Sequence, residues 1–293
     1  MRVQVNGTRL WFDVDGPALV PDGSSMRARP TVVLIHGGPA SYDHSYFKPW
    51  FADVAQYAQV IYLDLRDHGR SARGDPASWT FEAAADDIPA FCDAVGISHP
   101  VVYGHSMGGM VVALYGARHP GHAAGLVLQS TMARFDLDRL VEAVRSQAGD
   151  DVAELARRAY SVNDVSAEEW ARVFVTFGPH RPTREELARR RSNPALAAHG
   201  GELLARFDAV DLLGSTASRA LVCVGELDAI TPVAAARELA DALPDGIARL
   251  EIIPGAGHFT WLDRPDVYWP MLQAFVRDVA AEAQAGEATV PAP

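Results

Sequence analysis

The chain has 293 residues, 48% of them apolar, and its formal net charge at pH 7 is −11. This length allows one large α/β domain or two ordinary domains, and the apolar content is enough for a sizeable buried core. The negative charge argues against nucleic acid and against an anionic membrane surface as partners, because both require basic patches.

The chain opens with a hairpin signal. Arg2–Val5 and Arg9–Asp15 alternate apolar and polar residues on either side of Asn6-Gly7, which predicts two antiparallel strands. Residues 16–29 are predicted to form a polar loop. No cationic leader with an apolar stretch opens the chain, and no run of about 18 apolar residues occurs in it, so we expect a cytoplasmic protein without a membrane partner.

Buried strands then alternate with helices. Thr31–Ile35 is a continuous apolar run, which is typical of a strand covered on both faces in a parallel sheet. The elements predicted after it are helix-like residues to about Tyr57, a strand at Val60–Leu63, a helix at Thr80–Val95, a strand at Val101–His105, a helix to about His119 and a strand at Gly125–Leu128.

Residues 131–216 interrupt this alternation. They contain helix signals, including capping boxes at Ser166–Glu169 and Thr183–Glu186, and no convincing strand. The elements predicted beyond them are strands at Ala220–Val224 and Ala248–Ile253, a helix at Val233–Leu243, a last helix from Pro265 to about Ala281 and a frayed tail. We therefore predict a mostly parallel, doubly wound α/β sheet built from residues 1–130 and 217–293, with a helical cap at residues 131–216.

The motif Gly104-His105-Ser106-Met107-Gly108 connects a β-branched strand to a helix rich in small residues. In that context Gly-x-Ser-x-Gly forms a sharp turn, and the glycines avoid clashes while the serine takes strained backbone geometry. We expect Ser106 to project its hydroxyl above the sheet, at the positive end of the following helix. This placement favours a nucleophilic role.

A serine nucleophile needs a base to take its proton and an acid to orient that base. In a parallel sheet such groups lie in loops at the carboxyl ends of strands. Asp228 and His258 follow the last two predicted strands, and His258 stands in Gly-Ala-Gly-His-Phe. Glu226 is an alternative acid, and Asp136 and Asp138 are weaker ones.

The oxyanion of such a reaction needs two backbone N–H donors. One is expected from Met107, directly after the serine, and the other from Gly38 in His36-Gly37-Gly38-Pro39. The sequence contains no His-Glu-x-x-His, no grouping of carboxylates with histidines and no phosphate-binding glycine loop, so we expect no metal site and no cofactor.

From Thr31 to about Leu128, and again from Ala220 to the last helix, the chain resembles the α/β-hydrolase superfamily, in which the catalytic residues follow the order serine, aspartate, histidine. His36-Gly37-Gly38-Pro39 and Asp64-Leu65-Arg66-Asp67-His68-Gly69-Arg70-Ser71 resemble the HGGPG and DQRGxGxS patterns of its proline iminopeptidase branch. Ala40 departs from the first pattern, and Asp67-His68 departs from the second. The serine motif Gly-His-Ser-Met-Gly-Gly is the form of esterases, lactonases and C–C hydrolases.

The resemblance implies a cofactor-free serine hydrolase that acts on an ester, lactone or amide of a small, largely apolar molecule. Trp170 and Phe174 are candidates to bind this substrate, since they fall on one helical face with Phe177. The alternative is a proline iminopeptidase-type aminopeptidase, in which a cap carboxylate such as Glu202 would bind the substrate ammonium. A non-catalytic receptor or a cofactor-less oxygenase on the same fold is a further alternative, and the sequence leaves open whether the chain forms a homodimer.

Overall fold

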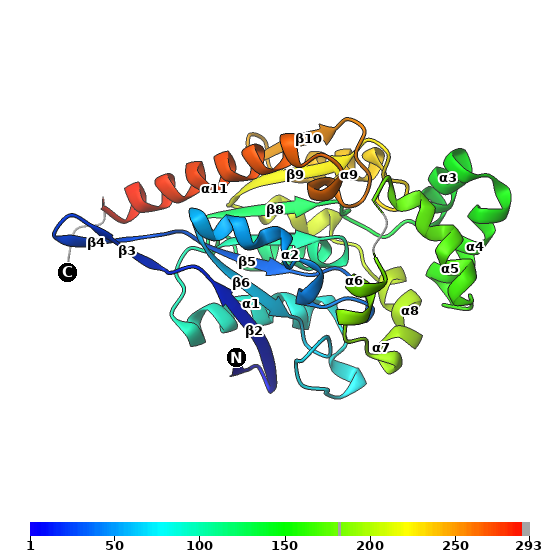
Figure 1. Ribbon diagram of the computed structural model, residues 1–293, viewed down its shortest axis with the longest axis horizontal. Helices are drawn as coiled ribbons and strands as arrows, with labels where there is room; N and C mark the ends of the chain where they lie inside the picture. Colours follow the sequence, from blue (N-terminus) through cyan, green and yellow to red (C-terminus); the bar gives the residue numbers. More distant parts are fainter. Residues whose placement is uncertain (181–182, 289–293) are drawn as a thin grey trace.

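The computed structural model describes residues 1–180 and 183–288. Its centre is a sheet of eight strands in the order β1-β2-β6-β5-β7-β8-β9-β10 (Figure 1). The strands are β1 (Arg2–Val5), β2 (Thr8–Asp15), β5 (Thr31–Ile35), β6 (Gln59–Asp64), β7 (Val101–His105), β8 (Gly125–Gln129), β9 (Arg219–Gly225) and β10 (Ala248–Ile253). β1 pairs antiparallel with β2, and β2 with β6, whereas all pairs from β6 to β10 are parallel. The predicted mostly parallel α/β sheet is confirmed.

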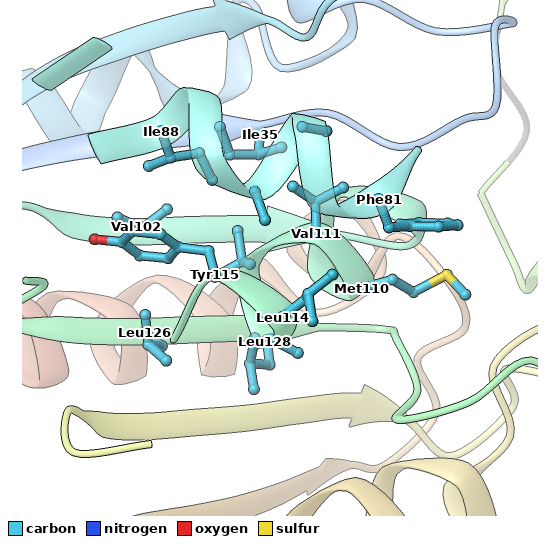
Figure 2. Close-up of a cluster of buried hydrophobic side chains, with 14 of the residues drawn as sticks. Ile35, Phe81, Ile88, Val102, Met110, Val111, Leu114, Tyr115, Leu126 and Leu128 are labelled. Atoms are coloured by element: carbon cyan, nitrogen blue, oxygen red, sulfur yellow. The ribbon is translucent and has the colours of Figure 1, made fainter. Parts of the chain in front are cut away.

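Apolar side chains cover both faces of the parallel strands. In β5, Val33 and Ile35 contribute to one hydrophobic cluster, while Val32 and Leu34 contribute to the other. Neighbouring residues on a strand point to opposite faces, so a strand buried on both sides must be apolar throughout. Figure 2 shows part of the first cluster, in which Ile88, Leu114 and other helix residues lie against Val102 and Leu128 of the sheet.

Helices pack on each face of the sheet. The first cluster contains buried residues of α1 (Phe81–Val95), α2 (Met107–Arg118) and α9 (Val233–Ala242), and the second contains residues of α11 (Pro265–Ala288). The short helix α10 (Thr260–Asp263) precedes α11. Thr80 caps α1, since its hydroxyl accepts a hydrogen bond from the backbone N–H of Ala83 at 3.0 Å.

The regular elements described between β8 and β9 are all helices, joined by short loops. They are α3 (Leu137–Ala148), α4 (Asp150–Ser161), α5 (Ala167–Val173), α6 (Arg184–Arg189), α7 (Pro194–Ala198) and α8 (Gly200–Ala205), with the 3-10 helices η4 (Phe174–Phe177) and η5 (Val210–Ser215). Both predicted capping boxes form, at Ser166–Glu169 and at Thr183–Glu186. In Figure 1 this inserted segment lies beyond the ends to which the parallel strands point.

The structure corrects three local predictions. The predicted polar loop at residues 16–29 contains a second hairpin, β3 (Leu19–Asp22) and β4 (Ser25–Ala28), whose residues are nearly all exposed and so lack apolar alternation. The helix-like stretch before Tyr57 is 3-10 rather than α-helical, in η1 (His44–Tyr46) and η2 (Trp50–Gln56).

The third correction concerns the C-terminal tail. Helix α11 continues to Ala288, seven residues beyond its predicted end at Ala281, and the tail beyond Ala288 lies outside the described residues. Within the described ranges, no helix combines the length and apolarity needed to cross a membrane.

Candidate active site

Ser106 occupies a strained turn between β7 and α2. Its backbone φ of 56° and ψ of −126° lie in a region that residues other than glycine rarely adopt. The flanking glycines are required by contact: a Cβ on Gly104 would lie 2.3 Å from the Gly108 carbonyl oxygen, and one on Gly108 would lie 2.4 Å from that of His36. The sequence therefore forms the predicted turn because only hydrogen fits at both positions.

The backbone around Ser106 is held on both sides. Its N–H donates to the Gln129 carbonyl at 3.0 Å, and its carbonyl accepts from the Gly109 N–H at 2.9 Å and from the Thr131 hydroxyl at 2.8 Å. The serine is half-buried, and it lies on the wall of a cavity at the N-terminus of α2. A helix N-terminus favours negative charge, including charge that develops during a reaction.

His258 and Asp228 are brought together by the loops after β10 and β9. Nδ1 of His258 lies 2.8 Å from Oδ2 of Asp228, and both side chains are buried. Asp228 is held by its own loop, because its carboxylate also accepts the N–H groups of Ile230 and Thr231 and the Thr231 hydroxyl, the last at 2.6 Å. Because a carboxylate only accepts, the proton between the two side chains sits on Nδ1, which leaves Nε2 of His258 as a base.

The other candidate acids lie elsewhere. Glu226 is exposed and accepts the Gly255 N–H at 3.1 Å. Asp136 caps α3, and Asp138 pairs with Arg157 on the surface. Among the three acids weighed with Asp228, none makes a contact with His258 in the described structure.

The two expected oxyanion donors belong to segments that touch each other. A Cβ on Gly38 would lie 2.9 Å from Cε of Met107, and one on Gly37 would lie 3.2 Å from Cβ of Ser106. Gly38, Ser106, Met107 and His258 all line the same cavity. The loop after β5 therefore lies directly beside the serine turn.

A hydrogen-bonded chain through Tyr46 and His105 connects these segments. The Tyr46 hydroxyl accepts the Gly37 N–H at 2.9 Å and lies 2.9 Å from Nδ1 of His105, whose Nε2 lies 2.9 Å from the backbone oxygen of His258. Burial holds the pKa of His105 well below its usual value, so the ring is neutral. Since the His258 carbonyl can only accept, Nε2 of His105 carries the proton and Nδ1 accepts from the Tyr46 hydroxyl.

The cavity has a volume of about 550 Å³ and mostly apolar walls. Trp170 and Phe174, the predicted substrate-binding residues, both line it, together with Phe177, although α5 ends at Val173 and the two phenylalanines belong to η4. The inserted segment also touches the histidine: the Phe177 ring lies edge-on to His258 at 5.1 Å, and its carbonyl accepts the His258 N–H. The cavity volume of about 550 Å³ is normal for a small-molecule site.

Glu202 is placed outside this cavity. Its side chain is 59% exposed and pairs with Arg206 one helical turn away. Among the described residues of the cavity wall there is no aspartate or glutamate. The pairing partner four residues along explains the position of Glu202, since an i,i+4 ion pair on a surface helix keeps both side chains in solvent.

Three residues of kinds that bind metals come together in the described part of the chain, although the sequence pattern does not reveal them. Asp43, His44 and Asp64 are buried with their ligand atoms close to one another. These groups already bond to one another and to the backbone: Asp64 accepts from the backbone N–H and the ring Nδ1 of His44 and from the Arg70 N–H, and Asp43 accepts the Arg191 N–H at 2.9 Å. This group holds the loops after β5 and β6 against the inserted segment.

Sequence reasoning missed Tyr46, Thr231 and His105 as parts of the site. Thr231 was detectable in principle, because an aspartate side chain in a turn often accepts hydrogen bonds from the residues just after it. Tyr46 lies nine residues beyond Gly37 without a motif around it, and only the path of the chain brings its hydroxyl there.

Comparisons with known proteins identify similar sequences and a similar fold. A family model described as the alpha/beta hydrolase fold matches residues 30–265. The chain is 30% identical over 260 residues to a pimeloyl-(acyl-carrier protein) methyl ester esterase of Chromobacterium violaceum, covering 86% of this chain and 93% of the relative. It is 23% identical over 280 residues to a proline iminopeptidase of Pestalotiopsis fici, covering 90% and 95%. The structure of a proline iminopeptidase of Mycobacterium smegmatis superimposes with a TM-score of 0.74 at 21% identity, covering 97% of this chain and 99% of that one.

Proposed function

The chain belongs to the alpha/beta hydrolase family, in its proline iminopeptidase-like branch, and from this premise we propose that it is a serine hydrolase of small, largely apolar esters or lactones. That it is a hydrolase of the esterase, lipase or iminopeptidase type follows from its relatives. The proposal adds the nucleophile, the mechanism and the class of substrate.

The observation that carries the proposal is the Asp228–His258 pair, whose histidine lines the same cavity as the strained Ser106. In the proposed reaction, Ser106 Oγ attacks the ester carbonyl carbon while Nε2 of His258 takes the hydroxyl proton. Asp228 orients the ring and stabilises its cationic form. The N–H groups of Gly38 and Met107 receive the oxyanion, and loss of such a donor typically costs about 3 kcal/mol of transition-state stabilisation.

The tetrahedral intermediate then collapses. The bond to the alcohol breaks, His258 returns its proton to the leaving oxygen, and an acyl ester of Ser106 remains. Water attacks this ester with His258 again as base, which releases the acid and restores the serine. The sequence of steps converts one ester and one water into an acid and an alcohol, so it requires neither a cofactor nor a metal.

We assign residues 131–216 the role of a cap over the cavity, with Trp170 and Phe174 as substrate-contacting residues. Their position on the wall supports this role. An apolar, aromatic roof excludes water from a charged transition state, which strengthens the electrostatic interactions beneath it.

An aminopeptidase activity is the second candidate, because proline iminopeptidases are among the relatives. Such an enzyme must neutralise a buried substrate ammonium, and an unpaired buried charge is costly. The described wall offers arginine rather than a carboxylate. This charge favours the ester reaction over removal of an N-terminal residue.

The test compares two substrates on purified wild-type protein and on Ser106→Ala. We expect turnover of p-nitrophenyl butyrate by wild type alone, and little or no release of β-naphthylamine from proline β-naphthylamide. Efficient cleavage of the proline amide, with ester turnover far slower, would establish the aminopeptidase instead. Turnover of neither substrate class would favour a receptor.

A further inference from the structure

Arg190 places a positive charge on the wall of an otherwise apolar cavity. Among the described residues that line this cavity, Arg190 carries the only permanent charge. It follows directly after α6 and caps its C-terminal end with an extended backbone. The cation is therefore part of the inserted segment, whereas Ser106 belongs to the sheet side of the same cavity.

Arg190 is packed against Tyr42. Its guanidinium carbon lies 4.6 Å from the centroid of the Tyr42 ring, and both residues line the cavity. Tyr42 in turn packs on Tyr46, with ring centroids 5.2 Å apart. Burial raises the pKa of Tyr42, and the nearby Arg190 charge opposes this rise without reversing it. Tyr42 is therefore neutral at physiological pH, so its hydroxyl adds no negative charge beside Arg190.

This contact suits a binding role. A guanidinium that lies over an aromatic ring keeps its N–H donors in its own plane, and here the Tyr42 side chain also hydrogen-bonds to Arg190, so these donors are shared with it. That planar fork matches a carboxylate, with which it forms two parallel, charge-assisted hydrogen bonds. In an apolar cavity the attraction is stronger than it would be on the surface, because the effective dielectric constant is lower.

We propose that Arg190 binds a carboxylate carried by the substrate, so that the preferred substrate is an ester or lactone with a second, anionic end. A single arginine matches the single charge of a carboxylate better than the charge of about −1.5 to −2 of a phosphate monoester. This inference rests on the proposed function for the identity of the bond that is cleaved. The anion site itself can be tested without turnover.

The kinetic test uses matched esters on wild-type protein. Monomethyl adipate and monomethyl suberate are compared with methyl hexanoate and methyl octanoate, and acid release is followed at constant pH. We expect kcat/KM for the anionic ester to exceed that for its neutral match by about 10-fold or more, mainly through a lower KM, and the ratio to fall as salt is added.

Arg190→Gln should lower this ratio to about one or less. The matched control is Arg189→Gln, because Arg189 is adjacent, exposed and bound to the Lys48 carbonyl at 3.4 Å, away from the cavity wall. This control should keep the wild-type ratio. A wild-type preference for the neutral esters, or an unchanged ratio in Arg190→Gln, would overturn the proposal.

A binding measurement separates this inference from the proposed function. By calorimetry, monomethyl adipate should bind Ser106→Ala about 10-fold more tightly than it binds the double variant Ser106→Ala, Arg190→Gln. Equal affinities would refute the anion site even if Ser106 is the nucleophile. A clear difference would support it even if Ser106→Ala retained full esterase activity and so refuted the proposed mechanism.

Discussion

The carboxylate of Asp228 is fixed in one orientation. It contacts the His258 imidazole, and it also accepts hydrogen bonds from its own loop, including the Thr231 hydroxyl. Replacing it by asparagine keeps the size of the side chain. The amide, however, can present its NH₂ group to His258, which would then hold the wrong tautomer for proton transfer from Ser106.

We therefore expect Asp228→Asn to fold normally and to lose about four orders of magnitude in kcat, by analogy with other serine hydrolase triads. Glu226→Gln, two residues earlier and exposed, is the control and should retain activity within a few-fold. Esterase assays with thermal melts of both variants check this. A crippled Glu226→Gln beside an active Asp228→Asn would show that the other carboxylate is the acid.

Tyr46 is expected to act through its neighbours rather than on the substrate. Tyr46→Phe removes the hydroxyl that joins the Gly37 N–H to His105, so the loop of the oxyanion donors loses its link to the His258 backbone. We expect kcat to fall about 10- to 100-fold with KM nearly unchanged, because a misplaced donor weakens only transition-state binding.

Tyr268→Phe is the control for Tyr46→Phe, since it also removes a buried hydroxyl. The Tyr268 hydroxyl donates to that of Tyr103 at 2.9 Å, away from the cavity. Equal losses in both variants would reduce the role of Tyr46 to packing.

At the level of elements, α5 and η4 join the inserted segment to the active site. The Trp170 ring packs edge-on to Tyr160 at 5.6 Å, and the Phe174 ring stacks on Phe177 at 4.3 Å. Phe177 contacts His258 directly. One short stretch of chain thus supplies both part of the cavity wall and a support for the proposed base.

Trimming this wall should change substrate size preference. Trp170→Ala and Phe174→Ala are each expected to raise KM for a bulky p-nitrophenyl ester about 10-fold, because removing a large aromatic side chain from an apolar pocket weakens binding by on the order of 1–3 kcal/mol. KM for the acetate should change much less. Leu212→Ala, on the exposed side of η5, is the control. Equal changes for both esters in the two cavity variants would show that these rings only stabilise the fold.

The elements differ in how well the sequence predicts them. Continuous apolar runs identify the inner parallel strands such as β5 and β7, because a strand buried on both faces leaves no other composition, whereas the edge strand β10 carries Arg249 and Glu251 and is mostly half-buried. The hairpin β3–β4 escapes prediction because it is exposed, although Asp22-Gly23 is a recognisable turn signal. The pattern of Trp170, Phe174 and Phe177 predicts a shared face, but it does not predict that the α-helix ends at Val173.

Residues of the candidate site show the same division. Ser106, Asp228 and His258 can be selected as candidates from the sequence, because each follows a predicted parallel strand. Tyr46 and Arg190 cannot, because their roles depend on where loops and an inserted segment pass in space. Glu202 is predicted to line the cavity only because it is a carboxylate in the inserted segment. In the structure it pairs with Arg206 on the surface instead.

Across the whole molecule, three buried histidines link stability to pH. Burial lowers the pKa of His36, of His105 and of His68, the last to about 3, and for His36 and His68 it outweighs the opposing charge of Asp64. In the unfolded chain a histidine takes up a proton near pH 6.5. Between that value and the lowered pKa of the folded state, the unfolded chain binds more protons, so stability falls as the pH falls.

We expect the free energy of unfolding to decrease between pH 7.5 and pH 5.5, by up to about 1.4 kcal/mol per pH unit for each such histidine once the pH is well below 6.5. Urea titrations at both pH values measure it. His68→Gln should show a shallower dependence than wild type, whereas His199→Gln, at an exposed position, should not differ from wild type. Equal wild-type stability at the two pH values would contradict the burial of these rings as neutral groups.

The central claim is that Ser106 is the nucleophile. Its most direct test is covalent labelling with a fluorophosphonate probe, followed by mass spectrometry of the labelled peptide. The account predicts stoichiometric modification at Ser106, parallel loss of esterase activity, and no labelling of Ser106→Ala, whose far-UV spectrum should match that of wild type. Equal labelling of wild type and Ser106→Ala, or full activity in the alanine variant, would contradict it.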